Sequence, residues 1–298
     1  MLASHRFSSF QRLAVATTVT TYLLILVGGL VRASGAGLGC PDWPRCFGQW
    51  IPPSSAAELP LQFDPKLFNP TLMWTEYLNR LLGVAVGFLI LATFVSAWRH
   101  HRREPRILWT TGAALLLTGF QGWLGGRVVA HELAPWIVTA HLIVALVIVQ
   151  LLLYATVRTW RATRGRLSPL VSALIVVTMI QIGLGALVRG AVDLATDSGI
   201  ARESAIATVG LADHLHRNAA LLVLVGVFIV MIVLRSKRAE LMTLRWAYVT
   251  LALAIAQVAF GMSMVYVSLA PAAQVTHLTI ASLLLGAETV LLLSSGAR

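Results

Sequence analysis

Four polar side chains lie at matching places in otherwise apolar stretches of the sequence: Asn79, His141, His216 and His277. Two histidines on facing helices can bind the two axial positions of a heme iron. Ionisable side chains are costly within membrane-spanning helices and usually face a bundle interior or a functional site. The pair of His216 and His277 therefore predicts a heme or metal site. The alternative is that each histidine only hydrogen-bonds between helices.

A carboxylate and an arginine accompany two of these four positions at the same spacing. Residues 76–80 read Glu-Tyr-Leu-Asn-Arg, and residues 213–217 read Asp-His-Leu-His-Arg. Side chains three or four positions apart lie on one face of a helix, so the carboxylate, the central polar side chain and the arginine share a face in each segment. The repetition predicts two comparable internal sites.

Three arginines lie at the outer ends of predicted spans, where positive charge is uncommon: Arg32, Arg127 and Arg189. Each needs a local anion. Arginine binds carboxylates with paired hydrogen bonds, so heme propionates at the outer surface are one candidate partner, with Arg217 as a further contact. Outer-loop acids and lipid phosphates are the other candidates, and both alternatives stay open.

The two cysteines, Cys40 and Cys46, flank a Pro-Asp-Trp-Pro-Arg segment in the first outer loop. The predicted topology puts this loop in the oxidising compartment, where a short disulfide loop can form. The pair is either a structural staple for the long loop or a redox-active pair beside a heme. Its spacing matches neither a zinc motif nor a heme-attachment motif.

The elements that must position these residues are membrane helices. The chain has 298 residues, of which 57% are hydrophobic and 12% are charged, and its mean hydropathy is +0.79. A helix needs ~20 predominantly apolar residues to cross a bilayer. Runs of this length predict spans at 13–32, 72–97, 107–129, 137–158, 169–189, 211–234, 245–267 and 274–295.

The net charge of +11 is concentrated in alternate loops. Arginine and lysine clusters follow the second, fourth and sixth predicted spans, whereas the opposite loops hold acids. The positive-inside rule therefore predicts cytoplasmic termini and a multi-pass protein of the cell (cytoplasmic) membrane. The short basic turns lack interleaved aromatic residues, which argues against nucleic-acid binding.

The spans fall into two similar sets of four. Three segments recur in the second half of the chain: 121–141 at 257–277, 76–80 at 213–217, and 30–32 at 187–189. Four spans per repeat is an even number, so both halves cross the membrane in the same sense. The predicted fold is an all-α integral membrane protein with eight transmembrane helices in two pseudo-symmetric four-helix bundles. The predicted halves are 1–165, with a long outer loop at 33–71, and 166–298.

Several of these segments together resemble the heme A synthase family. The sequence at 28–46 reads Gly-Gly-Leu-Val-Arg-Ala-Ser-Gly-Ala-Gly-Leu-Gly-Cys-Pro-Asp-Trp-Pro-Arg-Cys. The other matching segments are Glu76-x-x-Asn79-Arg80, His216-Arg217 and the repeated His141 and His277. The resemblance covers essentially the whole chain. It implies two four-helix halves, with heme b and its iron held between His216 and His277.

The resemblance also implies an activity for the first half. Family members oxidise a methyl group of heme O to a formyl group, which gives heme A for terminal oxidases. The matching substrate-heme residues are Asn79, Arg80 and His141, and Glu76 matches an acid that the family needs for activity. Asn79 departs from the histidine that is common there, so His141 is the remaining candidate iron ligand. The first-loop cysteine pair is associated with activity in bacterial members.

Heme O is thus the expected substrate, and membrane lipid is the expected surrounding. A heme O synthase, terminal oxidase assembly factors and a second copy of the chain are candidate partners. The alternative function is a b-type membrane cytochrome that only transfers electrons, and it predicts tolerance of Glu76→Gln. A transporter ranks last, because transporters with such repeats have helices broken at the midplane, whereas the prolines here lie near span ends.

Overall fold

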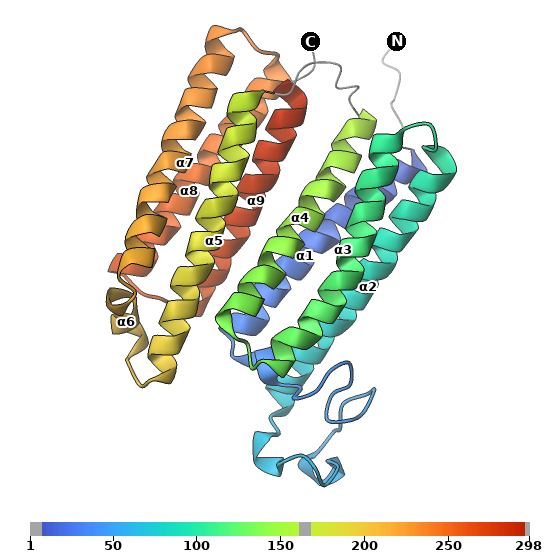
Figure 1. Cartoon of the computed structure of the whole chain (residues 1–298), viewed down its shortest axis with the longest axis vertical. Coiled ribbons are helices and arrows are strands. Elements are labelled where there is room, and N and C mark those ends of the chain that lie inside the picture. The colour runs from blue at the N-terminus through green and yellow to red at the C-terminus, as the bar shows by residue number, and fades with distance from the viewer. Residues whose placement is uncertain (1–7, 161–167, 296–298) are drawn as a thin grey trace.

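The computed structural model describes residues 8–160 and 168–295, and this part of the chain is all-helical apart from its loops (Figure 1). The long helices are α1 (Ser9–Ala33), α2 (Pro70–His100), α3 (Pro105–Ala130), α4 (Pro135–Trp160), α5 (Pro169–Asp197), α7 (Leu211–Ser236), α8 (Leu241–Tyr266) and α9 (Pro271–Ser295). The short helix α6 (Arg202–Ala205) follows α5. The short 3-10 turns are η1 (Ala36–Leu38), η2 (Ala56–Glu58), η3 (Pro65–Leu67) and η4 (Ile206–Thr208). Each predicted span is confirmed as a helix.

Seven of the long helices in the described part of the chain are long and apolar enough to cross a membrane. The chain is therefore an all-α, multi-pass membrane protein. The remaining long helix is α3, which spans 26 residues but carries Thr110, Thr111, Thr118 and Gln121 among its apolar residues. These polar side chains lower its mean hydropathy, which is why α3 does not reach the hydropathy of the other seven.

Proline determines where many of these helices begin. Five of the long helices start with proline: Pro70, Pro105, Pro135, Pro169 and Pro271. The first N–H groups of a helix have no partner within the helix, so proline, which lacks an N–H and has a fixed φ, is favoured at this position. The predicted spans consequently begin within four residues of the observed helices.

The helices form two sets in Figure 1, and α4 and α1 of one set also contact α9 of the other, as α4 contacts α5. In the first set α1 contacts α2 and α4, and α3 lies between α2 and α4. In the second set α5 contacts α7 and α9, and α8 lies between α7 and α9. A separate apolar cluster that includes Ile25, Leu146, Ile182 and Leu285 joins α1, α4, α5 and α9. We call this four-helix contact the seam.

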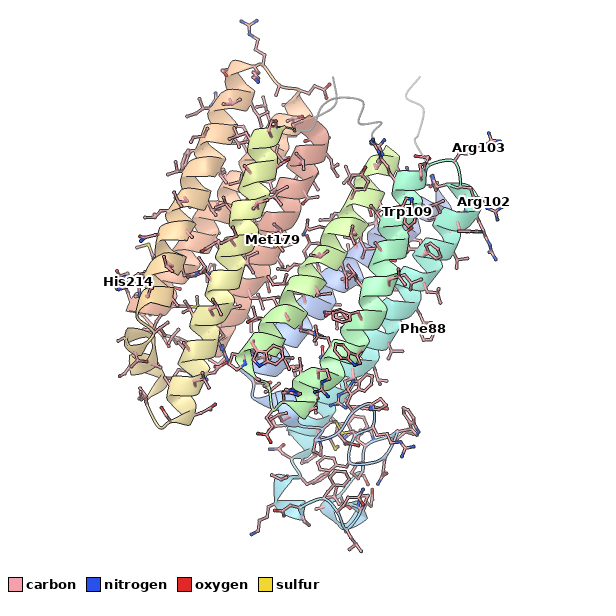
Figure 2. All side chains as sticks on the ribbon, in the orientation of Figure 1. Phe88, Arg102, Arg103, Trp109, Met179 and His214 are labelled. Carbon is pink, nitrogen blue, oxygen red and sulfur yellow. A yellow bond between two sulfur atoms is a disulfide. The ribbon has the colours of Figure 1, made fainter. Side chains whose placement is uncertain are left out.

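The connection between α1 and α2 covers residues 34–69 and extends beyond the ends of the helices (Figure 1). Within it, the hydroxyl and the N–H of Ser54 donate to Glu58 over 2.6 and 2.8 Å. These hydrogen bonds lower the pKa of the exposed Glu58 carboxyl. The basic residues Arg102 and Arg103 lie at the opposite end of the molecule (Figure 2).

Helix α5 is longer than its predicted span, which ended at residue 189. The helix continues to Asp197 and turns at Gly199, whose φ of +94° is a conformation that glycine adopts without strain. The predicted end at residue 189 placed the acids Asp193 and Asp197 in the following outer loop. This prediction is wrong, because charged residues end an apolar run without ending a helix. The additional turns put Asp193 one turn after Arg189.

Candidate functional site

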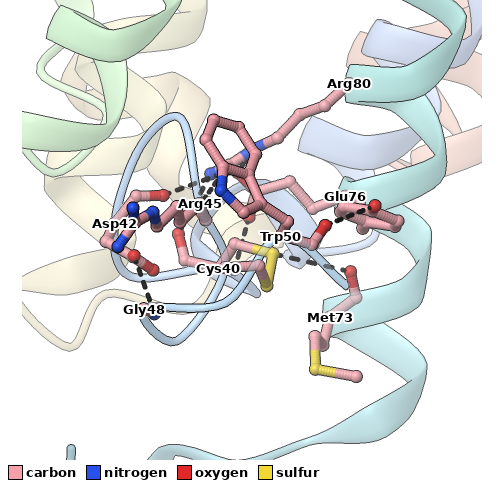
Figure 3. Close-up of a disulfide and its surroundings, with 10 residues drawn as sticks. Cys40, Asp42, Arg45, Gly48, Trp50, Met73, Glu76 and Arg80 are labelled. Carbon is pink, nitrogen blue, oxygen red and sulfur yellow. Dashed lines mark hydrogen bonds and ion pairs between the residues drawn. A yellow bond between two sulfur atoms is a disulfide. The ribbon is translucent and has the colours of Figure 1, made fainter. Parts of the chain in front are cut away.

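Glu76 is the most tightly held acid of the first half. It lies on α2, its residue exposure is 4%, and Figure 3 shows it beside the disulfide loop. The Cys40 N–H donates to Glu76 Oε2 over 2.8 Å, and Arg80 Nε donates to Oε1 over 3.0 Å. Arg80 Nη2 also donates to Oε1. Both carboxylate oxygens therefore have fixed donors, which orient the acid.

Arg80 connects the same acid to the backbone of the long loop. Its Nη1 donates to the carbonyl oxygens of Asp42 and Arg45 over 2.7 and 2.8 Å, and its Nη2 donates to the carbonyl of Cys40 over 3.2 Å (Figure 3). A guanidinium has five N–H donors. With the two contacts to Glu76, all five have acceptors, so Arg80 has no donor left for a further anion.

Cys40 and Cys46 form a disulfide, and their Cα atoms are 4.8 Å apart. Both cysteines are fully buried and pack with Phe47 and Met73 in a small apolar cluster between the loop and α2. The fold requires Gly39 at this contact, because a Cβ atom there would collide with the backbone of α2. The disulfide therefore closes the loop segment whose first N–H holds Glu76.

His216 of α7 and His277 of α9 lie together inside the second set of helices. Their ring centroids are 6.3 Å apart with an angle of 70° between the ring planes. An imidazole nitrogen binds a transition metal at about 2.0 Å, so two such bonds plus the two ring radii span about 6 Å. The spacing of the two rings therefore fits one iron atom between them.

The hydrogen bond of His216 and the packing around both rings also fit a heme iron, whereas His277 Nε2 lies 3.0 Å from Gln257 Nε2 and would have to leave this contact to bind a metal. His216 Nδ1 lies 3.3 Å from the Gln181 carbonyl oxygen, the contact that leaves the other ring nitrogen for a metal. His277 Nδ1 is buried without a partner. A Cβ atom on Gly185 would come within 2.8 Å of His216 Cε1, and one on Gly261 within 3.3 Å of His277 Cε1. The absence of a side chain at Gly185 and Gly261 thus provides the space that the His216 and His277 rings occupy.

Other residues near the second site are held differently. Asp213 is buried and pairs with Arg217 over 2.5 Å, and the Arg217 side chain is 43% exposed. His214 is exposed on the outward side of α7 (Figure 2). No group of three or more His, Cys, Asp or Glu side chains that could hold a bare metal ion occurs among the described residues. A heme needs only axial ligands from the protein, because its macrocycle fills the remaining positions.

The first half has a related arrangement with one histidine. Asn79 Oδ1 and His141 Nδ1 are both buried without a hydrogen-bond partner. A Cβ atom on Gly125, the repeat counterpart of Gly261, would lie 3.6 Å from His141 Cε1. A Cβ atom on Gly28, the counterpart of Gly185, would meet nothing within 4 Å. The unpartnered atoms of Asn79 and His141, together with the open space at Gly28, suit a polar ligand in this half.

The outer arginines differ in their partners. Arg32 Nη2 lies 2.6 Å from Asp193 Oδ2, and Arg189 Nε lies 2.9 Å from Asp193 Oδ1. This pairing matches the outer-acid alternative for these two residues and joins α1 to α5. Arg127 instead contacts His131 over 3.2 Å and is exposed.

Sequence reasoning missed two features of the site. It noted that Gln121 and Gln257 recur but gave them no role. The structure puts Gln257 Nε2 at 3.0 Å from His277 Nε2, and Gln121 Nε2 at 3.0 Å from the His141 carbonyl oxygen. It also overlooked Glu288, a fully buried acid of α9, although an acid within an apolar run is itself a signal.

Comparisons with known proteins agree with this arrangement. The family model COX15-CtaA, described as "Cytochrome oxidase assembly protein", matches residues 11–289. The chain is 34% identical over 149 residues to a heme A synthase of Shewanella oneidensis, which covers 48% of this chain and 43% of that protein. It is 33% identical over 124 residues to a heme A synthase of Geobacillus kaustophilus, which covers 42% of this chain and 34% of that protein. It is 30% identical over 194 residues to a heme A synthase of Bartonella quintana, which covers 56% of this chain and 54% of that protein. The aligned stretches thus span about a third to a half of the length of these relatives.

Proposed function

Because the chain belongs to the COX15-CtaA family of cytochrome oxidase assembly proteins, we propose that it is a heme A synthase, an oxidoreductase that converts a methyl group of heme O to a formyl group. The observation that carries this proposal is the buried Glu76, which both the Cys40 N–H and Arg80 orient. A cytochrome that only relays electrons has no need for a buried acid held in this way. The relatives named heme A synthase support the same reaction.

Glu76 is the proposed catalytic residue. Oxidation of a methyl group to a formyl group breaks two of its three C–H bonds, adds one oxygen atom at the level of water, and releases protons together with electrons that an acceptor must take up. A carboxylate at the reacting carbon can accept a proton or stabilise positive charge there. Arg80 then acts as a positioning residue, because all its donors are used by Glu76 and the loop. The disulfide between Cys40 and Cys46 is proposed to hold the loop that carries the Cys40 N–H.

The substrate heme O is proposed to bind in the first half, with Asn79 and His141 toward its iron. His141 is the candidate iron ligand, and the unpartnered Asn79 oxygen would offer the bound substrate a further polar contact. Arg127, which is exposed and has no acid partner among the described contacts, is the proposed propionate contact of this half.

The second half is proposed to hold heme b between His216 and His277. This group would supply reversible one-electron transfer, and the two imidazoles would bind and orient it. Arg217 is the proposed propionate contact, because its exposed guanidinium keeps free donors beside Asp213. Arg32 and Arg189 could reach a propionate only in competition with Asp193.

We also propose that the two sets of helices are pseudo-symmetric four-helix bundles. The predicted boundary between the halves 1–165 and 166–298 lies outside the described residues. Helix α3 then provides the eighth membrane crossing, since it runs alongside α2 and α4 (Figure 1). The basic loop at Arg102 and Arg103 supports the proposal that this end of the molecule lies on the cytoplasmic side of the cell membrane, as the predicted termini do. Heme O synthase, terminal oxidase assembly factors and a second copy of the chain are the proposed partners.

The second candidate is a b-type cytochrome that only transfers electrons. Asn79 favours this second function. It occupies the position where a second histidine would complete an axial pair in the first half, so only the second half has the two histidines of a heme site. This function predicts that no heme changes covalently. It also predicts that Glu76→Gln has no effect on heme composition.

Heme extraction distinguishes the two functions. The chain is expressed with a heme O synthase in a host that lacks heme A, and the extracted hemes are separated by chromatography. Heme A should appear with the wild-type chain and disappear with Glu76→Gln at an unchanged protein level. Heme b alone, with heme O available in the same cells, would reject the synthase and favour the cytochrome.

A further inference from the structure

Glu288 is a carboxyl group in the interior of α9 that the proposed function does not use. The surrounding sequence from 283 to 293 is Leu-Leu-Leu-Gly-Ala-Glu-Thr-Val-Leu-Leu-Leu, and Glu288 is fully buried. It lies 17 residues after Pro271 and 7 residues before Ser295, the two ends of the helix. At 1.5 Å per residue these separations are about 25 and 10 Å. The carboxyl group therefore lies in the membrane core, nearer the end with the basic loops.

The contacts of Glu288 leave it without a compensating charge. The Thr178 hydroxyl of α5 donates to Glu288 Oε1 over 2.8 Å, and Glu288 Oε2 is buried without a hydrogen-bond partner. No ion pair to Glu288 occurs among the described residues. An isolated carboxylate is strongly unfavourable in such surroundings, whereas a neutral carboxyl group is tolerated.

The side chains that neighbouring helices present to this part of α9 carry no charge. Helix α1 contributes the Tyr22 hydroxyl against Gly286, and α4 contributes Tyr154, which packs near Val290. Helix α5 contributes the hydroxyl that hydrogen-bonds Glu288. Helix α8 contributes Trp246 to the same apolar cluster. The titratable groups that these helices present to this part of α9 are therefore the two tyrosines, which pack at Gly286 and Val290, and a proton is the available counter-charge for Glu288.

Polar groups continue from Glu288 along the seam. The adjacent Thr289 donates to Gln150 Oε1 of α4 over 2.6 Å, and Gln150 also interacts with the Tyr22 side chain. Gln150 Nε2 is buried without a partner, like Glu288 Oε2. Buried polar atoms without a protein partner, such as each of these two, are the groups that internal water satisfies in proteins.

The same series reaches the level of the histidines. The Tyr22 hydroxyl donates to the Ser282 carbonyl oxygen over 3.4 Å, and the Ser282 hydroxyl donates to the Thr279 carbonyl oxygen over 2.8 Å. Thr279 lies two residues from His277. Polar groups therefore occur at intervals along α9 from Glu288 to His277, a separation of 11 residues or about 16 Å.

We propose that Glu288 binds a proton in the membrane core and is the loading site of a proton route along the seam toward His277. Buried acids aligned with hydroxyl and histidine side chains form proton relays in other membrane proteins. The end of the route rests on the proposed function, because a redox change at the histidine pair is what would draw the proton. Proton binding by Glu288 itself does not depend on that function.

Infrared spectroscopy of the purified full chain tests proton binding directly. A protonated carboxyl group has a C=O stretching band distinct from that of a carboxylate. At neutral pH the wild-type chain should show this band and Glu288→Gln should lose it, while Glu104→Gln, which removes an exposed acid in the loop between α2 and α3, should keep it. An unchanged band in Glu288→Gln would overturn the proposal. Should Glu288→Gln fail to fold, Glu288→Asp keeps a carboxyl group and must shift the band; an unshifted band would also overturn it.

The rate of proton uptake during reduction of the heme bound between the histidines tests the route. Stopped-flow reduction of the purified full chain in weak buffer with a pH-indicator dye measures this rate. Proton uptake should be slower in Glu288→Gln than in wild type, and unchanged in Glu104→Gln, because only Glu288 loads the route. Equal uptake rates in wild type and Glu288→Gln would overturn the route. An absence of heme A in cells, with the infrared result intact, would instead reject only the proposed synthase.

Discussion

Replacing Arg80 with methionine removes the guanidinium that joins Glu76 to the long loop. The side chains of Arg80 and Glu76 are only 14% and 6% exposed, and the three loop carbonyls that Arg80 binds would lose their donor. Removing one partner of a buried ion pair costs about 3–5 kcal/mol, because the remaining charge stays buried. We expect a loss of this size in the local stability of the loop.

The matched control is Arg217→Met at the repeated position of the second half. Arg217 pairs with Asp213, but its side chain is 43% exposed, so solvent screens the pair. Exposed pairs contribute about 0.2–1 kcal/mol. The two substitutions therefore remove the same atoms from equivalent sequence positions and differ in burial and in the number of loop contacts.

Hydrogen exchange followed by mass spectrometry measures the difference. The reporter amides are those of Cys40 and Gly48, which donate to Glu76 and Asp42. Each 1.4 kcal/mol is a factor of ten, so the loop peptide should exchange about a hundredfold to several thousandfold faster in Arg80→Met. The same peptide should be unchanged in Arg217→Met. Exchange that stays within about threefold of wild type in Arg80→Met would refute the assignment of Arg80 as the residue that holds the loop.

Three further outcomes are expected. Gly185→Ala forces the facing His216 ring to move, at an overpacking cost of about 1–3 kcal/mol, and should therefore lower the amount of heme bound per protein in the second half. Gly28→Ala should leave this amount unchanged. Absorption spectra of the purified proteins measure the heme content, and equal contents in the two variants would contradict the prediction. Replacing Cys40 and Cys46 together with serine should destabilise the loop by about 2 kcal/mol, the value for a short closed loop, and reduce heme A formation; full activity with unchanged exchange would return the disulfide to a passive staple. Asn79→His should convert substrate-loaded protein to the spectrum of two axial histidines, and an unchanged spectrum would place Asn79 away from the iron.

The arrangement of helices was largely predictable from the sequence. Apolar runs of ~20 residues report lipid burial directly, and proline marks where many of the helices begin. The repeat of Gln121 to His141 at Gln257 to His277 predicts two related regions; in the structure each glutamine contacts its histidine, one at the carbonyl oxygen and one at the ring. Helix α5 extended beyond its prediction because an apolar run measures membrane depth, whereas a helix ends only where a residue such as Gly199 turns the chain.

Side-chain partners were predictable only where they lie on one helix. The pairing of Glu76 with Arg80 follows from their four-residue spacing. The contacts of Arg80 with the loop and of Arg32 with Asp193 connect segments 35 to 161 residues apart, and no local pattern encodes them. Glu288 was visible as an acid in an apolar run, but its isolation depends on which helix faces it.

The burial of α9 has a consequence for how the chain is assembled. In its most apolar stretch 67% of the residues are buried, against at most 33% in the other candidate spans, and it contacts α1, α4, α5 and α8. During synthesis α9 emerges after all of these partners. The faces of α1, α4 and α5 that later cover α9 must therefore remain in lipid, or against another protein, until α9 is inserted. Without α9 the chain would lack His277 and Glu288 together, and these faces would stay open.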